Sequence, residues 1–176
     1  MNSNPINQST GPSPASATTM APRRLQLVWS IKEEPAAVLR VAFASTDRSR
    51  VNQHFGAAEG FAIYEVVPDK ATLVGVADFP EEAMDGNENK LAAKVEFLAG
   101  CHAVYVKAIG ASAIKQLMAK GIQPIRTDEV DAIPELLAEI SRAMKEGGVQ
   151  WIDRAIAAQT KSDDRFSEME DEGWQG

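Results

Sequence analysis

The amino-acid sequence predicts an α/β fold, in which helices pack on a mixed five-stranded sheet. Three strand-like segments follow one another early in the chain, and segments with helical spacing of apolar residues then alternate with short apolar strands. Apolar residues make up 44% of the 176 residues, which is enough to bury the core of one domain.

The first three strands are expected at 38–45, 61–67 and 71–79. The first reads VLRVAFAS and is interpreted as a core strand. A turn at 68–70, with the sequence Pro-Asp-Lys, separates the second strand from the third, so these two are expected to pair as a hairpin.

After the hairpin the spacing of apolar residues changes to that of a helix. A helix is expected over 87–100, with Asn87 as its N-cap and Gly100 at its end, and a fourth strand at 102–109 follows. The apolar residues expected on the inner face of this helix are Leu91, Val95 and Leu98.

The same alternation continues through the second half of the chain. A short helix at 110–121, a strand at 122–127 and a third helix at 131–148 are expected, and Asp131 is in position to cap the third helix. A further helix is expected from Val149. The residues of the short helix expected to face inward are Ile114, Leu117 and Met118.

The connections between strands predict the topology of the sheet. Strands joined through helices run parallel with right-handed crossovers, whereas strands joined by tight turns run antiparallel. The simplest arrangement is a mixed sheet of order 3-2-1-4-5, in which the first strand is central and lies beside the fourth. This order is the ribonuclease-H-like motif.

The predicted domain is flanked by segments of different composition. Residues 1–22 are rich in Ser, Thr, Asn and Pro and have neither a basic start nor an apolar run, which indicates a disordered arm and not a secretory signal. An extended arm at 23–37 leads into the α/β domain at 38–147. A C-terminal helix at 148–162 and an acidic tail at 163–176 follow.

Charge and cysteine content argue against several functions. The net charge of −7 argues against general binding of nucleic acids, which requires Lys and Arg to neutralise phosphates. A single cysteine excludes an internal disulfide and a four-cysteine metal site within one chain, and it fits a reducing cytoplasm. No run approaches the roughly 18 apolar residues that cross a bilayer, so no membrane attachment is expected.

A binding site is expected where the loops after the first and fourth strands meet. In open α/β sheets, ligands bind beyond the carboxyl ends of parallel strands, where neighbouring connections diverge. Here the two loops would bring together an imidazole, several cations and the free N–H groups of a helix start, which suits an anionic ligand. These residues are His54, Arg48, Arg50, Lys107, Gly110, Ala111 and Ser112.

The role of His54 is open on the residues alone. A lone histidine in a loop is commonly structural. However, the neighbouring Phe55 is expected to fill the core, and in an extended segment His54 would then face solvent. Gly56 permits a turn or a close approach of the backbone to a ligand.

Two other groups of residues suggest different chemistry. Cys101 and His102 begin the fourth strand, at the opposite end of the sheet from His54, and adjacent strand residues point to opposite faces, so we expect no catalytic pair there. A metal-dependent nuclease requires clustered carboxylates. Asp47 lies just past the first strand, but the first strand itself contains no carboxylate.

Two long segments of the chain carry a family resemblance. LRVAFASTDRSRVNQHFGAAEGFAIYEV (39–66) and DGNENKLAAKVEFLAGCHAVYVKAIGASAIKQLMAKGIQPI (85–125) resemble the dinitrogenase iron–molybdenum cofactor biosynthesis family, in particular its NifX-type members. NafY, NifY and the C-terminal domain of NifB are relatives in that family. The resemblance extends over about residues 25–158, and its most recognisable pieces are HFG at 54–56 and GASA at 110–113.

The resemblance implies a carrier and not an enzyme. Such a protein binds an iron–sulfur precursor of the iron–molybdenum cofactor and transfers it, in the cytoplasm, between a NifB-type cluster synthase and the scaffold complex on which the nitrogenase cofactor is built. The resemblance also implies that His54 is the metal ligand. The accompanying cofactor-binding residues are Arg48, Arg50, Asn52, Gln53, Lys107, Gly110 and Ser112.

The chemistry of the cargo is compatible with so few protein ligands. A preassembled cluster brings its own sulfides, and permanently bound clusters use several cysteines, which this chain lacks. Two other functions stay open. One is a regulatory or assembly module that binds proteins without a cluster, and the other is a metal-dependent hydrolase that uses Asp47.

Overall fold

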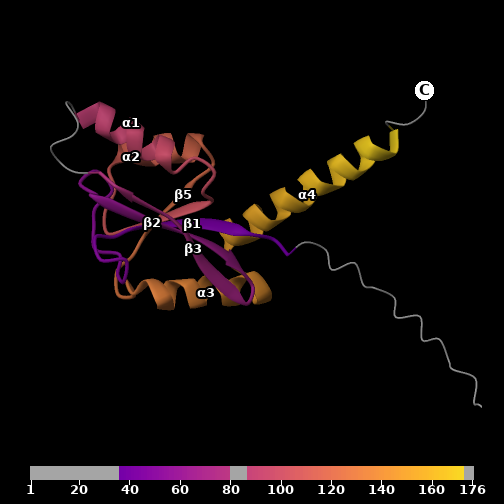
Figure 1. Ribbon diagram of the computed structural model, residues 1–176, viewed down its shortest axis with the longest axis horizontal. Helices are drawn as coiled ribbons and strands as arrows, with labels where there is room; N and C mark the ends of the chain where they lie inside the picture. The colour runs from indigo at the N-terminus through magenta and orange to yellow at the C-terminus, as the bar shows by residue number, and fades with distance from the viewer. Residues whose placement is uncertain (1–35, 80–86, 173–176) are drawn as a thin grey trace, which may run out of the picture. The chain divides into compact units, whose positions relative to one another are not determined.

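The structure, a computed structural model, describes residues 36–79 and 87–172. The arm expected at 1–22 and nearly all of the extended arm at 23–37 lie outside these residues. The described elements follow one another along the chain as strands and helices (Figure 1). They are β1 (Leu39–Ala44), β2 (Gly60–Val67), β3 (Lys70–Asp78), α1 (Asn87–Phe97), β4 (Ala103–Val106), α2 (Ala111–Ala119), β5 (Gln123–Arg126), α3 (Ile133–Glu146) and α4 (Gln150–Glu172).

The strands form one mixed sheet in the order β3-β2-β1-β4-β5, which confirms the predicted order. β1 pairs antiparallel with β2, with Phe43 opposite Ala62, and parallel with β4, with Phe43 opposite Tyr105. β4 and β5 are also parallel. The carboxyl ends of the three parallel strands therefore meet at one edge of the sheet, where the loops after β1 and β4 begin.

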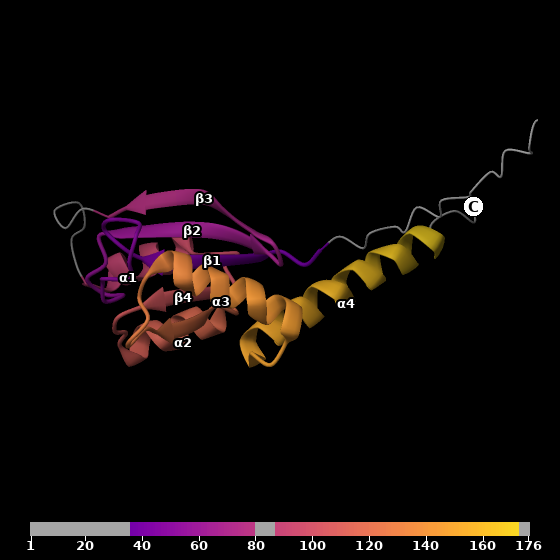
Figure 2. The same ribbon diagram turned by 90° about the horizontal axis from the view of Figure 1, so that it is seen from below.

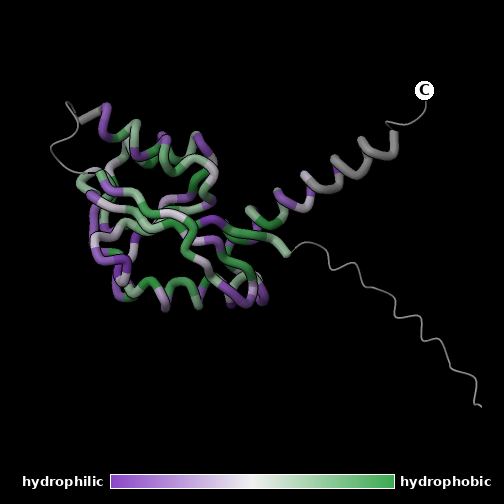
Figure 3. Tube along the Cα trace, viewed as in Figure 1, coloured by the Kyte–Doolittle hydropathy of each residue, from purple (hydrophilic) through white to green (hydrophobic). Residues whose placement is uncertain are grey.

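Helices cover both faces of the sheet, with α1 and α2 on one face and α3 on the other (Figures 1 and 2). Alternate residues of β1 point to the two sides, since Ala42 belongs to the core under α1 and α2, whereas Phe43 belongs to the core under α3. The central strands are mostly hydrophobic along their length (Figure 3), as expected for strands buried on both faces.

Two local expectations were wrong. Ile114 and Met118 were expected to face inward from α2, but they are 37% and 49% exposed, and Ala113 and Leu117 are buried instead. The buried face of α2 is narrow, since it consists of Ala113 and Leu117, and Ile114 and Met118 lie outside it.

Asp131 does not cap α3 through its side chain. The N-cap of α3 is Ala132, which makes no side-chain capping bond. The backbone N–H of Ile133 donates instead to the carbonyl of Ser49 at 2.9 Å, and the Asp131 carboxylate forms ion pairs described below.

The last helix is longer than predicted. α4 runs from Gln150 to Glu172, through positions that were expected in the acidic tail. Its first half is joined to the start of β1, because the Gln159 amide accepts the N–H of Val38 at 3.1 Å and donates to the Val38 carbonyl at 2.8 Å. None of the described helices is both long and apolar enough to span a membrane.

Candidate functional site

The loops that follow β1 and β4 meet, and main-chain hydrogen bonds join them. The N–H of Lys107 donates to the carbonyl of Gln53 at 2.9 Å, and the N–H of Phe55 donates to the carbonyl of Ala108 at 2.8 Å. His54 lies between the two loop residues that make these bonds. The position of its backbone is therefore held by the continuation of β4.

The loop places His54 and Phe55 in opposite environments. His54 is exposed, whereas Phe55 is fully buried. The Phe55 ring lies 5.7 Å from the ring of Phe61, which in turn lies 6.0 Å from Phe79. Because the aromatic contacts anchor Phe55, the adjacent imidazole is kept at the surface.

A buried lysine of α1 donates hydrogen bonds to the same loop. Lys94, in the last turn of α1, is 5% exposed. Its Nζ donates to the carbonyl of Gly56 at 2.6 Å and lies 3.4 Å from the carbonyl of Phe55. Burial lowers the pKa of this ammonium, and the charge of Lys90 lowers it further.

The start of α2 follows directly after the joined segment. Gly110 is the N-cap residue, with φ −81° and ψ 157°, and no side chain caps the helix there. The first N–H groups of a helix have no partner within it, so they are available to an anion at this end of α2. A Cβ added to Gly110 or to Gly56 would meet no atom within 4 Å, so both glycines leave open space.

Two of the expected cations are already paired with a carboxylate. The Nε of Arg50 lies 2.9 Å from Oδ1 of Asp131, and the Nζ of Lys107 lies 3.1 Å from Oδ2 of the same residue. The hydrogen bond from Lys107 lowers the pKa of Asp131, as does the charge of Arg50. The positive charge expected to attract an anionic ligand is therefore partly neutralised by Asp131.

Arg48 is exposed and takes part in none of the ion pairs formed within residues 36–79 and 87–172. Its φ is 61°, in the left-handed region that non-glycine residues rarely adopt. Its backbone N–H donates to Oγ of Ser45 at 2.9 Å.

The side chains of Asn52 and Gln53 close the loop. Asn52 Oδ1 accepts the N–H of Thr46 at 3.1 Å, and its Nδ2 donates to Oγ1 of Thr46 at 2.9 Å. Gln53 Oε1 accepts the N–H groups of Glu59 and Gly60 at 3.0 and 3.1 Å. In this structure both side chains shape the segment that carries His54.

Asp47 has a similar structural task at the end of β1. Its Oδ1 accepts the N–H groups of Ser49 and Arg50 at 2.8 and 3.0 Å, and the hydroxyl of Ser45 at 3.1 Å. The hydrogen bonds from the Ser49 and Arg50 backbones lower the pKa of Asp47 to about 2. Within the described part of the chain, no group of three or more His, Cys, Asp or Glu residues is arranged to hold a metal ion.

Cys101 and His102 lie at the other end of the sheet, as expected. Cys101 is buried, and burial raises the pKa of its thiol to about 11. The Nδ1 of His102 accepts the N–H of Arg40 at 2.9 Å, at the start of β1. Neither residue contributes to the region around His54.

Lys94 and Asp131 make two contacts of the site that the sequence analysis did not predict. For Lys94 a signal was present: it lies three residues after Leu91 and directly before Val95, within the apolar stripe expected to face the sheet. For Asp131 no local signal distinguishes an N-cap from an ion-pair partner, since its two cations are distant in sequence.

Comparisons with known proteins agree on one family. A sequence model described as "Dinitrogenase iron-molybdenum cofactor" matches residues 37–143. Protein NifX of Azotobacter vinelandii is 47% identical over 154 residues, covering 86% of this chain and 96% of that protein. Protein NifY of the same organism is 25% identical over 130 residues, covering 74% of this chain and 53% of that protein. The FeMo cofactor biosynthesis protein NifB of Frankia alni is 38% identical over 112 residues, covering 60% of this chain and 21% of that protein.

Proposed function

Since this chain belongs to the dinitrogenase iron–molybdenum cofactor family, we propose that it is a carrier for an iron–sulfur precursor of that cofactor. The carrier binds the precursor through His54 and releases it to a later protein of the assembly. It acts in the cytoplasm and performs no reaction of its own. The α/β domain at 38–147 holds the site, and we assign its sheet to the ribonuclease-H-like motif.

The observation that supports this proposal most is the exposed imidazole on a rigid support. His54 projects from a segment whose main chain is bonded on both sides to the continuation of β4, and whose next residue is buried. The open space at Gly56 lies two residues after His54. The uncapped start of α2, at Gly110, lies two residues after Ala108, whose carbonyl accepts the N–H of Phe55. An anionic cluster suits an imidazole next to free N–H groups.

The donor set also suits a cargo better than a resident metal ion. A single ion held by protein alone needs three or four side-chain ligands, and the described residues contain no such group. A preassembled cluster supplies its own sulfides, so one imidazole can occupy a single iron position. Few protein ligands also favour release, which a carrier requires. In this role, Arg48, Ser112 and the N–H groups from Gly110 onward lie on the cargo side, whereas Asn52 and Gln53 support the loop.

The proposed partners are a NifB-type cluster synthase as donor and the scaffold complex of the nitrogenase cofactor as acceptor. The likeness to NifB and NifY relatives supports a place in that assembly system. An assembly module without a cluster would use the same family membership but would need neither an exposed histidine nor open space beside it.

The test is cargo retention by matched histidine variants. Wild type, His54→Ala and His102→Ala are purified without oxygen from a nitrogen-fixing host and passed through gel filtration. Iron per chain and visible charge-transfer absorbance are then measured. We expect wild type and His102→Ala to carry iron and His54→Ala to lose most of it. Full iron retention by His54→Ala would overturn the ligand role, and an iron-free wild type would favour the assembly module.

A further inference from the structure

Lys94 is the cation that the structure places most deeply at the His54 loop. It reaches from the last turn of α1 to the carbonyls of Gly56 and Phe55, at 2.6 and 3.4 Å. Phe55 and Gly56 are the two residues that follow His54, so the ammonium holds the backbone next to the residue that carries the imidazole. A hydrogen bond from a charged donor is stronger than a neutral one, which makes this contact an effective clamp.

Lys94 differs from the other cations of the region in how its charge is neutralised. Arg50 and Lys107 share the carboxylate of Asp131. Lys94 forms none of the salt bridges found among the described residues, although its side chain is buried. Burying a charge is costly, and among the described residues two backbone carbonyls, rather than a carboxylate, offset this cost for Lys94.

The electrostatic environment supports the same view. Burial lowers the pKa of Lys94, which means that its surroundings do not supply the negative charge that an ammonium prefers. Lys90, one turn earlier on the same helix, lowers the pKa further. A bound anion near the loop would offset both effects and would be attracted in return.

We propose that Lys94 is a positioning residue of the cargo site, which clamps the 55–56 backbone and provides a buried positive charge that selects an anionic cargo. The inference rests on the proposed function in so far as the cargo is the anionic iron–sulfur precursor. The clamp itself is independent of which anion binds.

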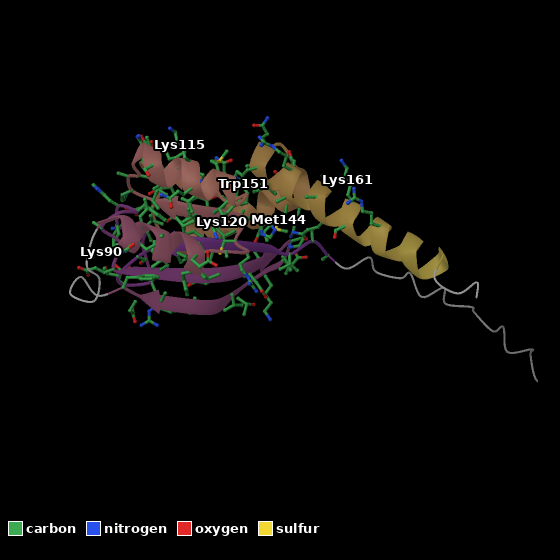
Figure 4. All side chains as sticks on the ribbon, turned by 90° about the horizontal axis from the view of Figure 1, so that it is seen from above. Lys90, Lys115, Lys120, Met144, Trp151 and Lys161 are labelled. Carbon is green, nitrogen blue, oxygen red and sulfur yellow. The ribbon has the colours of Figure 1, made fainter. Side chains whose placement is uncertain are left out.

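The test uses tetrathiomolybdate, a dianionic metal sulfide, as a defined probe under anaerobic conditions. Its dissociation constant is measured by calorimetry for the full chain and for Lys94→Met, Lys94→Arg and a control, Lys120→Met. Lys120 pairs with Glu96 at 2.5 Å just beyond the far end of α2, and Figure 4 shows it toward Trp151 and away from Lys90. Circular dichroism verifies that each variant is folded, and Lys94→Gln replaces Lys94→Met if the latter does not fold.

We expect Lys94→Met to bind about tenfold more weakly, which corresponds to about 1.4 kcal/mol, because charge and clamp are both lost. Lys94→Arg should stay within about threefold of wild type, since it keeps the charge and the donors, and Lys120→Met should be unchanged. A purely structural role would lower the stability of Lys94→Met and leave the affinity of the folded protein intact, and that result would overturn the proposal.

A second measurement needs no cargo. Nitrogen-15 relaxation should show lower order parameters for residues 54–57 in Lys94→Met than in wild type and Lys120→Met. If the wild type takes up no probe, unchanged order in Lys94→Met overturns the clamp, and reduced order supports it. Weak binding by Lys94→Met combined with normal binding by His54→Ala would retain the Lys94 inference and reject His54 as the ligand.

Discussion

The backbone N–H of Lys107 donates to the carbonyl of Gln53 at 2.9 Å, and this bond joins two loops that are 54 positions apart in the chain. A second main-chain bond, from the N–H of Phe55 to the carbonyl of Ala108 at 2.8 Å, joins the same two loops beyond the paired residues of β1 and β4. Of the side chains on the two joined segments, Phe55 is buried, Gln53 and Lys107 are engaged in contacts within the protein, and His54 is exposed to solvent.

Phe55 and His54 should differ sharply in their effect on stability. Phe55→Ala removes a fully buried ring from an aromatic row and should lower the free energy of unfolding by about 3–5 kcal/mol. His54→Ala changes an exposed side chain and should alter the same free energy by less than about 0.5 kcal/mol. Urea denaturation followed by circular dichroism measures both, and a large loss in His54→Ala would mean that the imidazole is structural.

Gly60 should not tolerate a side chain. A Cβ at this position would lie 2.7 Å from the backbone carbonyl oxygen of Ser45. The two residues are held together by the hydrogen bond from the N–H of Ser45 to the carbonyl of Gly60 at 3.0 Å. Gly60→Ala should cost about 1–3 kcal/mol through overpacking. Gly75→Ala is the matched control, because its Cβ would meet only Ile63 at 3.8 Å. Equal thermal unfolding of the two variants would contradict the prediction.

Gly56 should separate stability from binding. Its φ is not in the left-handed region and a Cβ there meets nothing within 4 Å, so Gly56→Ala should leave the free energy of unfolding unchanged or raise it by up to about 1 kcal/mol. If cargo occupies the open space, the same variant should retain less iron after anaerobic purification. Iron retention at the wild-type level would place the cargo elsewhere.

Asp47 should contribute to stability in a pH-dependent manner. Backbone N–H groups of Ser49 and Arg50 lower its pKa to about 2, below its usual value of 3.8. The stabilisation is therefore fully present above about pH 4 and is lost as the pH falls toward 2. The difference in the free energy of unfolding between wild type and Asp47→Asn should shrink over this interval. A constant difference from pH 6 to pH 2 would show that the charge of Asp47 is not involved.

Asp131 should weaken the attraction of the site for anions. Asp131→Asn removes the negative charge shared by Arg50 and Lys107 and keeps one of the two oxygens that they contact, so one of the two hydrogen bonds can be retained. We expect tetrathiomolybdate to bind about two- to fivefold more tightly at low ionic strength, and the gain to decline in 0.5 M salt because exposed charges are screened. Calorimetry at two salt concentrations measures this, and unchanged affinity at low salt would exclude these cations from the site.

The elements and the sheet order could be predicted because they depend on short-range patterns. The apolar run of β2, the helical spacing in α3 and the turn at 68–70 are local signals, and the handedness of crossovers then restricts the order of strands. The inner face of α2 was less predictable. Ile114 and Met118 are apolar and were therefore expected on the buried face. In the structure the smaller Ala113 lies on that face, and both larger residues are exposed.

The sequence by itself predicted the arrangement of the candidate site: the loops after β1 and β4 meet, and Phe55 enters the core while His54 faces solvent. Only the tertiary structure decided how charge is distributed there. Asp131 reaches Arg50 across 81 residues of sequence, and Lys94 reaches the carbonyl of Gly56 across 38. Such contacts depend on the packing of whole elements, and no local pattern distinguishes a paired cation from a free one.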